Sequence, residues 1–384
     1  MYAMDISLYV HYPFCLRKCF YCAFNSVVDS SLSPGEYVEA LLGEMELRSR
    51  AITRDRAAVT LYFGGGTPSL LAPSLVARIV EAAASLYSLK ADAEITLECN
   101  PGTVSGQLLA EFRSAGINRL SIGVQSFDDR MLQRLGRVHT AREALDAFML
   151  AREAGFANLG IDLIHSLPGQ TPDMWEKELL RACDLAPEHV SVYGLAVEEG
   201  TPFASLEKNG MLSLPEEDDA VRMFELSSEI LCGGGFEHYE ISNFARPGFR
   251  SRHNSGYWKR VPCLGFGAGA HSFCPEPAHG MRCATTEQVG EYLAALEKGE
   301  LPHREQRILD RRDAMAEWLF LGLRMSDGVD LQAFAAEFGA SFHEVYGEAC
   351  ADIFKAGLLE IRDGFLRLSR NGLVVSNQVF VRFL

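Results

Sequence analysis

The sequence predicts an α/β protein in which a partial, TIM-like (β/α)6 barrel precedes a smaller, winged-helix-like α+β domain. Two observations lead to this fold class. Short apolar runs alternate with helix-like stretches over the first half of the chain, and after residue 302 three helical patterns precede a hairpin. We therefore expect a barrel core in residues 1–230, an extension beside it in 231–301, and a C-terminal domain in 302–384.

The barrel strands are predicted from runs rich in Val, Ile and Leu, as buried parallel strands require. These runs are residues 7–14, 58–63, 93–98, 119–124, 158–164 and 189–195. Helix-like stretches separate them, at residues 34–50, 69–87, 105–114, 141–154 and 171–185. Because parallel neighbours need crossover connections, this alternation predicts parallel pairing. No Gly-x-Gly-x-x-Gly follows the first strand to mark a dinucleotide site.

The C-terminal part reads as three helices and a hairpin. The helices are expected at 309–323, 330–338 and 343–356, and the hairpin strands at 358–361 and 365–368. Winged-helix modules often bind DNA, so a DNA-binding regulator is a competing hypothesis. The segment 343–360 contains a single basic residue, Lys355, which argues against that role.

Composition limits the class of protein. The chain has 384 residues, of which 48% are hydrophobic and 23% charged, and no run approaches the roughly 18 apolar residues of a membrane-spanning helix. No leader sequence is visible at the N-terminus, so we expect a cytoplasmic location. The net charge of −15 argues against general binding to nucleic acids or anionic membranes. Seven cysteines are scattered singly, as in reduced cytosolic proteins: Cys99, Cys183, Cys232, Cys263, Cys274, Cys283 and Cys350.

The other three cysteines, Cys15, Cys19 and Cys22, directly follow the first strand. Three thiolates leave one iron of a 4Fe–4S cluster without a protein ligand, whereas an electron-transfer cluster normally has four cysteines. An open iron can bind a substrate. Two alternatives remain: a redox pair formed by Cys19 and Cys22, and a partial zinc site, although structural zinc requires a fourth ligand.

Polar residues and glycines gather where the predicted strands end. The segments are the cysteine loop, 64–68 (Gly-Gly-Gly-Thr-Pro), 98–101, 123–127, Asp162 with 167–169, and the region of Ala196. Because active sites of parallel barrels lie at the C-terminal ends of the strands, we expect these groups to converge on one rim.

Residues 9–22 spell Tyr-Val-His-Tyr-Pro-Phe-Cys-Leu-Arg-Lys-Cys-Phe-Tyr-Cys. With this motif the chain resembles, over essentially its whole length, the radical S-adenosylmethionine family that contains oxygen-independent coproporphyrinogen III oxidase and the HemW-type haem chaperones. The resemblance implies that Cys15, Cys19 and Cys22 hold a 4Fe–4S cluster. It also implies that the fourth iron takes the amino and carboxylate groups of S-adenosylmethionine, whose reductive cleavage gives a 5′-deoxyadenosyl radical.

The resemblance further implies which residues bind S-adenosylmethionine. Glycines at a strand end let backbone groups approach the methionine portion, carboxylates suit ammonium and ribose hydroxyls, and an arginine suits a carboxylate. The matching residues are Tyr9, Gly65, Gly66, Thr67, Glu98, Gln125, Arg137, Asp162 and Ala196. Taken alone, the glycine loop is equally a simple turn, and the alternative for each polar residue is a helix cap or a rim residue bonded to backbone.

A second block, residues 252–258, contains His253 beside Tyr257 and Trp258. Histidine is a common ligand of haem iron, and aromatic rings can cover a porphyrin face. Without further information, such a histidine is more often part of a packed surface corner. HemW-type chaperones carry a His-Asn-x-x-Tyr-Trp motif linked to haem binding, and His253, Asn254, Tyr257 and Trp258 reproduce it. The resemblance therefore implies haem as a ligand of His253.

Two departures from the oxidase disfavour coproporphyrinogen decarboxylation. The oxidase has a fourth cysteine where this chain has Phe24, and an N-terminal extension where only six residues precede Ser7. We therefore expect a haem chaperone that transfers haem to acceptor haemoproteins, such as membrane respiratory enzymes. The protein could associate peripherally with the membrane and could form a homodimer. The oxidase is the alternative function, a radical methyltransferase is a more remote one, and whether the chain catalyses a reaction is left open.

Other histidines and cysteines give weaker signals. No Cys-x-x-Cys-His is present for c-type haem attachment. Cys274 with His279 is a weak second haem candidate, although a turn at Pro275 and Pro277 explains the same residues. His271 ends a glycine-containing stretch, 265–272, which suggests tight backbone packing and a structural role.

Overall fold

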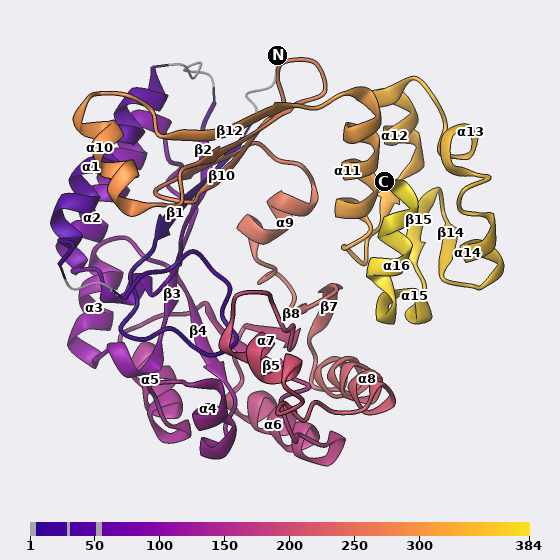
Figure 1. The fold of residues 1–384 in the computed structure, drawn as a ribbon, viewed down its shortest axis with the longest axis horizontal. Coiled ribbons are helices and arrows are strands. Elements are labelled where there is room, and N and C mark those ends of the chain that lie inside the picture. The colour runs from indigo at the N-terminus through magenta and orange to yellow at the C-terminus, as the bar shows by residue number, and fades with distance from the viewer. Residues whose placement is uncertain (1–4, 29–30, 51–55) are drawn as a thin grey trace.

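The computed structural model describes residues 5–28, 31–50 and 56–384, and its largest feature is a twelve-stranded mixed sheet (Figure 1). Six strands at the centre of this sheet run parallel in sequence order, which confirms the predicted α/β architecture. They are β1 (Ile6–Tyr12), β2 (Ala58–Gly65), β3 (Glu94–Cys99), β4 (Arg119–Gln125), β5 (Leu159–His165) and β6 (His189–Gly194).

Helices cover the outer side of these strands (Figure 1). The five predicted helices form as α1 (Pro34–Ser49), α2 (Pro73–Tyr87), α3 (Gly106–Ser114), α5 (Ala141–Glu153) and α6 (Pro172–Leu185). Helix α2 starts later than the predicted residue 69, because Ala72 is extended and Pro73 fits the first helical turn. A short 3-10 turn (Pro68–Leu70) precedes it. The structure adds α4 (Asp129–Leu135), α7 (Pro202–Lys208) and α8 (Glu217–Gly233).

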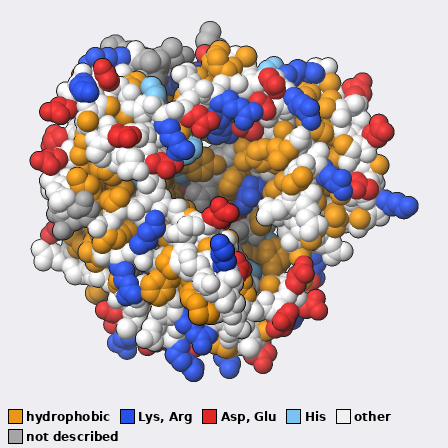
Figure 2. Space-filling view, viewed as in Figure 1, with side chains coloured by type: hydrophobic (Ala, Val, Ile, Leu, Met, Phe, Trp, Pro, Cys, Tyr) orange, Lys and Arg blue, Asp and Glu red, His pale blue; other side chains and the backbone are white. Residues whose placement is uncertain are grey.

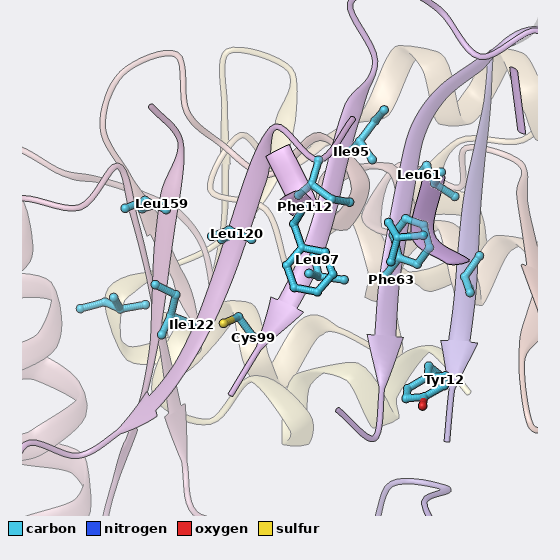
Figure 3. Close-up of a cluster of buried hydrophobic side chains, with 14 of the residues drawn as sticks. Tyr12, Leu61, Phe63, Ile95, Leu97, Cys99, Phe112, Leu120, Ile122 and Leu159 are labelled. Carbon is cyan, nitrogen blue, oxygen red and sulfur yellow. The ribbon is translucent and has the colours of Figure 1, made fainter. Parts of the chain in front are cut away.

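The parallel strands have one apolar and one polar face. Side chains that alternate along the strands, such as Leu61, Leu97 and Leu120, are fully buried against residues of the helices such as Phe112 (Figure 3). Because successive side chains of a strand point to opposite faces, the intervening residues point into the barrel. Those residues are largely polar or aromatic, and include Tyr9, Thr60, Tyr62, Glu94, Glu98, Arg119, Ser121, Asp162, His189 and Ser191.

Antiparallel strands extend the sheet at both edges. Next to β6 lie β8 (Asn243–Ala245) and β7 (Glu237–Glu240); next to β1 lie β9 (Cys263–Phe266), β10 (His271–Cys274), β11 (Met281–Thr285) and β12 (His303–Ile308). Strand β9 itself pairs parallel with β1. Helix α9 (Arg252–Trp258) runs from β8 to β9 and so connects the two edges across the inner side of the sheet (Figure 1).

The stretch 265–272 is tightly packed. A Cβ atom at Gly267, where φ is +102°, would lie 2.6 Å from the hydroxyl oxygen of Tyr37, so only glycine fits there. His271, at the start of β10, is exposed rather than enclosed by this packing. Residues 275–280 connect β10 to β11, in agreement with the turn interpretation of this segment. Helix α10 (Val289–Glu297) follows β11.

The C-terminal part has its own apolar core. Helices α11 (Arg311–Gly322) and α12 (Leu331–Phe338) form as predicted, and the hairpin of β14 (Leu359–Arg362) and β15 (Phe365–Leu368) is joined by β13 (Val329–Asp330). The prediction of a single helix over 343–356 is wrong. Two short helices, α13 (Phe342–Tyr346) and α14 (Ala351–Lys355), replace it, and Gly347, a poor helix former, lies at the break. The chain ends with α15 (Arg370–Val374) and α16 (Ser376–Phe380).

Helix α11 packs against α9 and the β10–β11 region. Glu317 accepts hydrogen bonds from Arg282 at 2.8 Å and lies 3.4 Å from Arg260. The guanidinium of Arg324 lies 4.3 Å from the ring centroid of Trp258. The division into 1–230, 231–301 and 302–384 remains a prediction. Strand β12, which lies just after the boundary at 302, pairs with β11 and so belongs to the large sheet.

The surface shows charged side chains of both signs interspersed, with a hollow near the middle of the face seen in Figure 2. Within the described residues, none of the helices combines the length and apolar character needed to cross a bilayer.

Candidate functional site

A cavity of about 470 Å³ lies inside the partial barrel. Each of the six parallel strands, or the loop that follows it, contributes to its wall. The lining contains most of the residues singled out in the sequence: Cys15, Cys19, Cys22, Gly65, Gly66, Thr67, Glu98, Gln125, Arg137, Asp162 and Ala196. The expected convergence on one rim is therefore present in the structure.

The cysteine sulfurs have hydrogen-bond donors beside them. The Thr67 hydroxyl donates to the sulfur of Cys15 at 3.4 Å, and the guanidinium of Arg137 donates to the sulfur of Cys19 at 3.5 Å. Arg137 is held in place by a second bond, at 2.9 Å, to the carbonyl of Gly123. Such donors stabilise the negative charge of metal-bound thiolates.

The cysteine segment forms one wall of the cavity. In a 4Fe–4S cubane each cysteine binds a different iron. Three thiolates on one cavity wall, with N–H and O–H donors at two of them, have the donor chemistry that such a cluster requires.

The glycine loop holds the cysteine segment by backbone contact. The Gly66 amide donates to the carbonyl of Tyr12 at 2.8 Å, and the Thr67 amide donates to that of Phe14 at 2.9 Å. A Cβ atom at Gly66 would lie 2.7 Å from the carbonyl oxygen of Phe14, so a side chain is excluded. The loop is thus more than a turn, because its close approach positions the start of the cysteine segment.

Two partly buried carboxylates face the cavity from β3 and β5. Glu98 accepts hydrogen bonds from the Tyr62 hydroxyl at 2.9 Å and the Gly65 amide at 3.2 Å, and burial raises its pKa to about 7. Asp162 accepts the Ser121 hydroxyl at 3.1 Å, and burial raises its pKa as well. Both retain free acceptor capacity toward the cavity, as ligands with ammonium or hydroxyl groups require.

Tyr9 and His253 lie behind the lining. The Tyr9 hydroxyl is 3.1 Å from Nδ1 of His11, and the Tyr9 ring stacks on that of Tyr62 at 6.1 Å. His253 is only 1% exposed. Its ring stacks on the ring of Tyr62, with 4.9 Å between the ring centroids.

Both ring nitrogens of His253 are occupied. Nδ1 lies 2.8 Å from the Thr60 hydroxyl and Nε2 lies 2.9 Å from the Tyr257 hydroxyl. Burial lowers the pKa of His253 to about 3, so the imidazole is neutral. The Glu94 carboxylate accepts the backbone amides of Arg252 and His253, both at 3.0 Å, and thereby caps the start of α9.

The chain matches known proteins over its whole length. Residues 9–182 match the Radical SAM superfamily and residues 309–375 match the HemN C-terminal domain. Similar proteins include Heme chaperone HemW of Lactococcus lactis subsp. lactis (strain IL1403), 35% identical over 98% of this chain and 97% of the relative. The chain belongs to the HemW family of radical S-adenosylmethionine proteins.

Further HemW-family matches have the same extent. Heme chaperone HemW of Bacillus subtilis (strain 168) is 35% identical over 98% of this chain and 99% of the relative. Heme chaperone HemW of Escherichia coli (strain K12) is 33% identical over 99% of this chain and 98% of the relative. The solved coproporphyrinogen III oxidase (HemN) of Escherichia coli has a TM-score of 0.85 at 23% identity and covers 100% of this chain and 91% of the oxidase, which establishes the fold. Membership of the radical S-adenosylmethionine superfamily implies a 4Fe–4S cluster and S-adenosylmethionine.

Several lining residues were missed from the sequence. They lie within strands rather than at strand ends: Tyr62, Arg119, Ser121, Ser191 and Tyr193. Asn254, noted in the sequence only as part of the motif at 253–258, lines the cavity as well. The signal was available in residues 119–125, Arg-Leu-Ser-Ile-Gly-Val-Gln, where small or polar residues alternate with apolar ones. This period of two marks a strand with one polar face, which in this HemW-family chain is the cavity side.

Proposed function

We propose that this chain is a haem chaperone, which binds haem together with a 4Fe–4S cluster and S-adenosylmethionine and transfers the haem to acceptor haemoproteins. One observation carries the proposal: the motif from His253 to Trp258 forms α9, which packs against the cavity wall through His253 and against the C-terminal domain through Trp258. The names of the HemW relatives support the same function.

The cavity residues divide into two groups by their chemistry. Cys15, Cys19 and Cys22 would hold the cluster, with Arg137 and Thr67 stabilising the charge on its sulfurs. The glycine loop, Glu98, Gln125, Asp162 and Ala196 would surround S-adenosylmethionine. When bound and reduced, this pair supplies a 5′-deoxyadenosyl radical.

We propose that haem binding at His253 begins with a release. A neutral imidazole is the form that binds iron, but the Tyr257 hydroxyl occupies Nε2 and the Thr60 hydroxyl occupies Nδ1. Haem therefore has to displace one of these partners. Tyr257 belongs to the same helix and moves with His253, so a small movement of α9 away from β2 would free Nδ1 from Thr60, whereas Nε2 becomes free when the Tyr257 side chain rotates away.

Haem titration of anaerobically reconstituted protein tests this proposal. Wild type should bind about one haem per chain, His253→Ala should bind more weakly, and Tyr257→Phe, which frees Nε2, should bind faster. The exposed His343 provides the matched control His343→Ala. Absence of haem binding by wild type, together with failure to activate an apo-haemoprotein, would overturn the function; an unchanged affinity and spectrum of His253→Ala would overturn only the ligand.

Coproporphyrinogen III oxidase is the second candidate, because its fold is shared. Phe24 stands where the oxidase pattern has its fourth cysteine, and it is exposed at the cavity mouth. We expect neither carbon dioxide nor protoporphyrinogen when the protein is incubated anaerobically with S-adenosylmethionine, a reductant and coproporphyrinogen. Turnover at catalytic rates would replace our proposal with this one.

The acceptor, the location and the oligomeric state complete the proposal. We propose haemoprotein acceptors that include membrane respiratory enzymes, a cytoplasmic protein that meets them at the membrane surface, and a homodimer. Sedimentation with vesicles that contain such an acceptor, and light scattering of the purified protein, test these points.

A further inference from the structure

The third cysteine of the motif, Cys22, differs from the other two in how it is held. Thr67 and Arg137 donate hydrogen bonds to the sulfurs of the other two cysteines. Within the described part of the chain, the hydrogen bonds of Cys22 stay inside its own loop, and its amide donates to the carbonyl of Cys19 at 3.2 Å. The next two residues, 23–24, are exposed, so packing does not hold this part of the loop either. The contact that fixes the third ligand therefore has to lie further along the loop.

Asn25 ties the loop to a distant part of the protein. Its side-chain nitrogen, Nδ2, donates to the carbonyl of Ala268 and to that of Glu287, both at 3.1 Å. Carbonyls only accept, so both N–H bonds of the amide are used. The acceptors follow β9 and β11, and Asn25 thus joins the cysteine loop to the edge of the sheet. Asn25 comes three positions after Cys22, a span of at most about 11 Å of chain.

A closed ring of four hydrogen bonds fixes Asn25 relative to β1, the strand from which the cysteine loop starts. Nε2 of His11 lies 2.8 Å from the backbone carbonyl of Asn25 and donates to it, because a carbonyl only accepts. The His11 carbonyl accepts the Tyr37 hydroxyl at 2.8 Å, and that hydroxyl accepts the Ala268 amide at 2.9 Å. The bond from Asn25 to Ala268 completes the ring. Each of these residues is therefore held from two sides.

The glycine-containing stretch 265–272 forms the receiving side of this contact. A Cβ atom at Gly269, where φ is +80°, would overlap Nδ2 of Asn25 and lie 3.2 Å from its Cγ. The Gly269 amide donates to the carbonyl of Thr286 at 2.8 Å, so the two segments that carry the acceptor carbonyls are bonded to each other. Glycine is required at residue 269 both by the positive φ and by the side chain of Asn25.

We propose that Asn25 is a positioning residue for the iron–sulfur cluster, because it fixes the part of the loop that returns from Cys22 and so directs the Cys22 sulfur. The base of the loop is closed next to it. The Cys15 amide donates to the Val27 carbonyl at 2.9 Å, and the Val27 amide donates to the Pro13 carbonyl at 2.8 Å. The position of the third cysteine relative to the first is thus set over a few residues that Asn25 anchors. The inference rests on the 4Fe–4S cluster that the superfamily implies and involves no haem.

Asn25→Asp tests the proposal, because the carboxylate has nearly the size of the amide but has no N–H to donate to the two carbonyls. Iron release to a chelator, measured anaerobically on cluster-loaded protein, should be about tenfold faster than in wild type, since two hydrogen bonds are lost. The electron paramagnetic resonance spectrum of the reduced cluster should change as well, because one ligand has moved. Asn118→Asp is the matched control. Asn118 donates to the Ala93 carbonyl at 2.8 Å, at the opposite end of the strands, so its replacement should leave iron release and the spectrum unchanged.

A cycle of two substitutions examines the same contact from its other side. Gly269→Ala, whose Cβ pushes against the Asn25 side chain, should also speed iron release. Combined with Asn25→Ala, it should release iron no faster than the faster single variant, because both changes remove one contact. Wild-type iron release and spectrum in Asn25→Asp, even with a lowered stability in urea, would show a purely structural role and overturn the inference, as would effects that multiply in the double variant. Since these measurements involve no haem, their failure leaves the proposed chaperone function standing.

Discussion

Replacement of His253 by glutamine should remove a defined part of the pH dependence of stability. The pKa of this imidazole is about 3 in the fold and about 6.5 in the unfolded chain. Since the unfolded state takes up the proton first, wild type loses stability as the pH falls below 6.5. With these two pKa values, the loss attributable to His253 is about 2 kcal/mol at pH 5 and close to zero at pH 7.

Chemical denaturation at pH 7 and pH 5 measures this contribution. His253→Gln should be less stable than wild type at pH 7, because the packing on Tyr62 and one or both hydrogen bonds are altered. Its further loss between pH 7 and pH 5 should be about 2 kcal/mol smaller than that of wild type. His343→Gln, at an exposed position, serves as the control and should keep the wild-type slope. If His253→Gln also keeps that slope, His253 is not a buried neutral imidazole and the described environment is wrong.

Three further outcomes follow from the contacts. Arg137→Met removes the donor to the Cys19 sulfur and should make the reduction potential of the cluster more negative, measured by a redox titration followed with electron paramagnetic resonance, because a nearby cation stabilises the more negative reduced form. Glu317→Gln leaves Arg260 without its buried counter-charge and should lower the free energy of unfolding by about 3 kcal/mol in urea denaturation. Gly267→Ala should lower it by more than about 2 kcal/mol, since the added Cβ meets packed atoms at a positive φ.

Each of these changes has a matched comparison. Arg137→Lys keeps a charge near the cluster, so an equal shift in both variants would argue against the charge as the cause of the shift. Glu229→Gln breaks the exposed ion pairs with Arg222 and Arg370, which solvent screens, and should cost much less than Glu317→Gln. Gly290→Ala, at an open helical position, should be tolerated. If Gly267→Ala is tolerated equally well, the packing around residue 267 is looser than described.

Local patterns carried much of the prediction. The six parallel strands and their helices followed from apolar runs and their spacing, and the cysteine and glycine segments followed from short motifs whose geometry is set within a few residues. The prediction of one helix over 343–356 failed because the helical periodicity of the segment hid the effect of one glycine, Gly347. The antiparallel strands at both sheet edges were missed because they have only three to six residues each and little periodicity.

The environment of each site residue was harder to predict than its presence. His253 is enclosed by Thr60, which lies 193 positions earlier, and no local pattern indicates that such a pair will meet. Arg119 and Tyr62 lie inside apolar runs that were interpreted as strands without deciding which side chains face inward. Once the strand direction is known, the period of two assigns them to the cavity, so the missing information was the choice of face.

The course of α9 between the two edges of the open sheet has a mechanical consequence. One end of the helix is tethered to β8 beside β6, the other to β9 beside β1, and its first turn rests on β2 through His253. The position of the motif is therefore coupled to the width of the barrel opening, because α9 connects the two edges of the parallel sheet. A ligand that draws α9 off β2 must also alter the gap through which the cofactor cavity communicates with its surroundings.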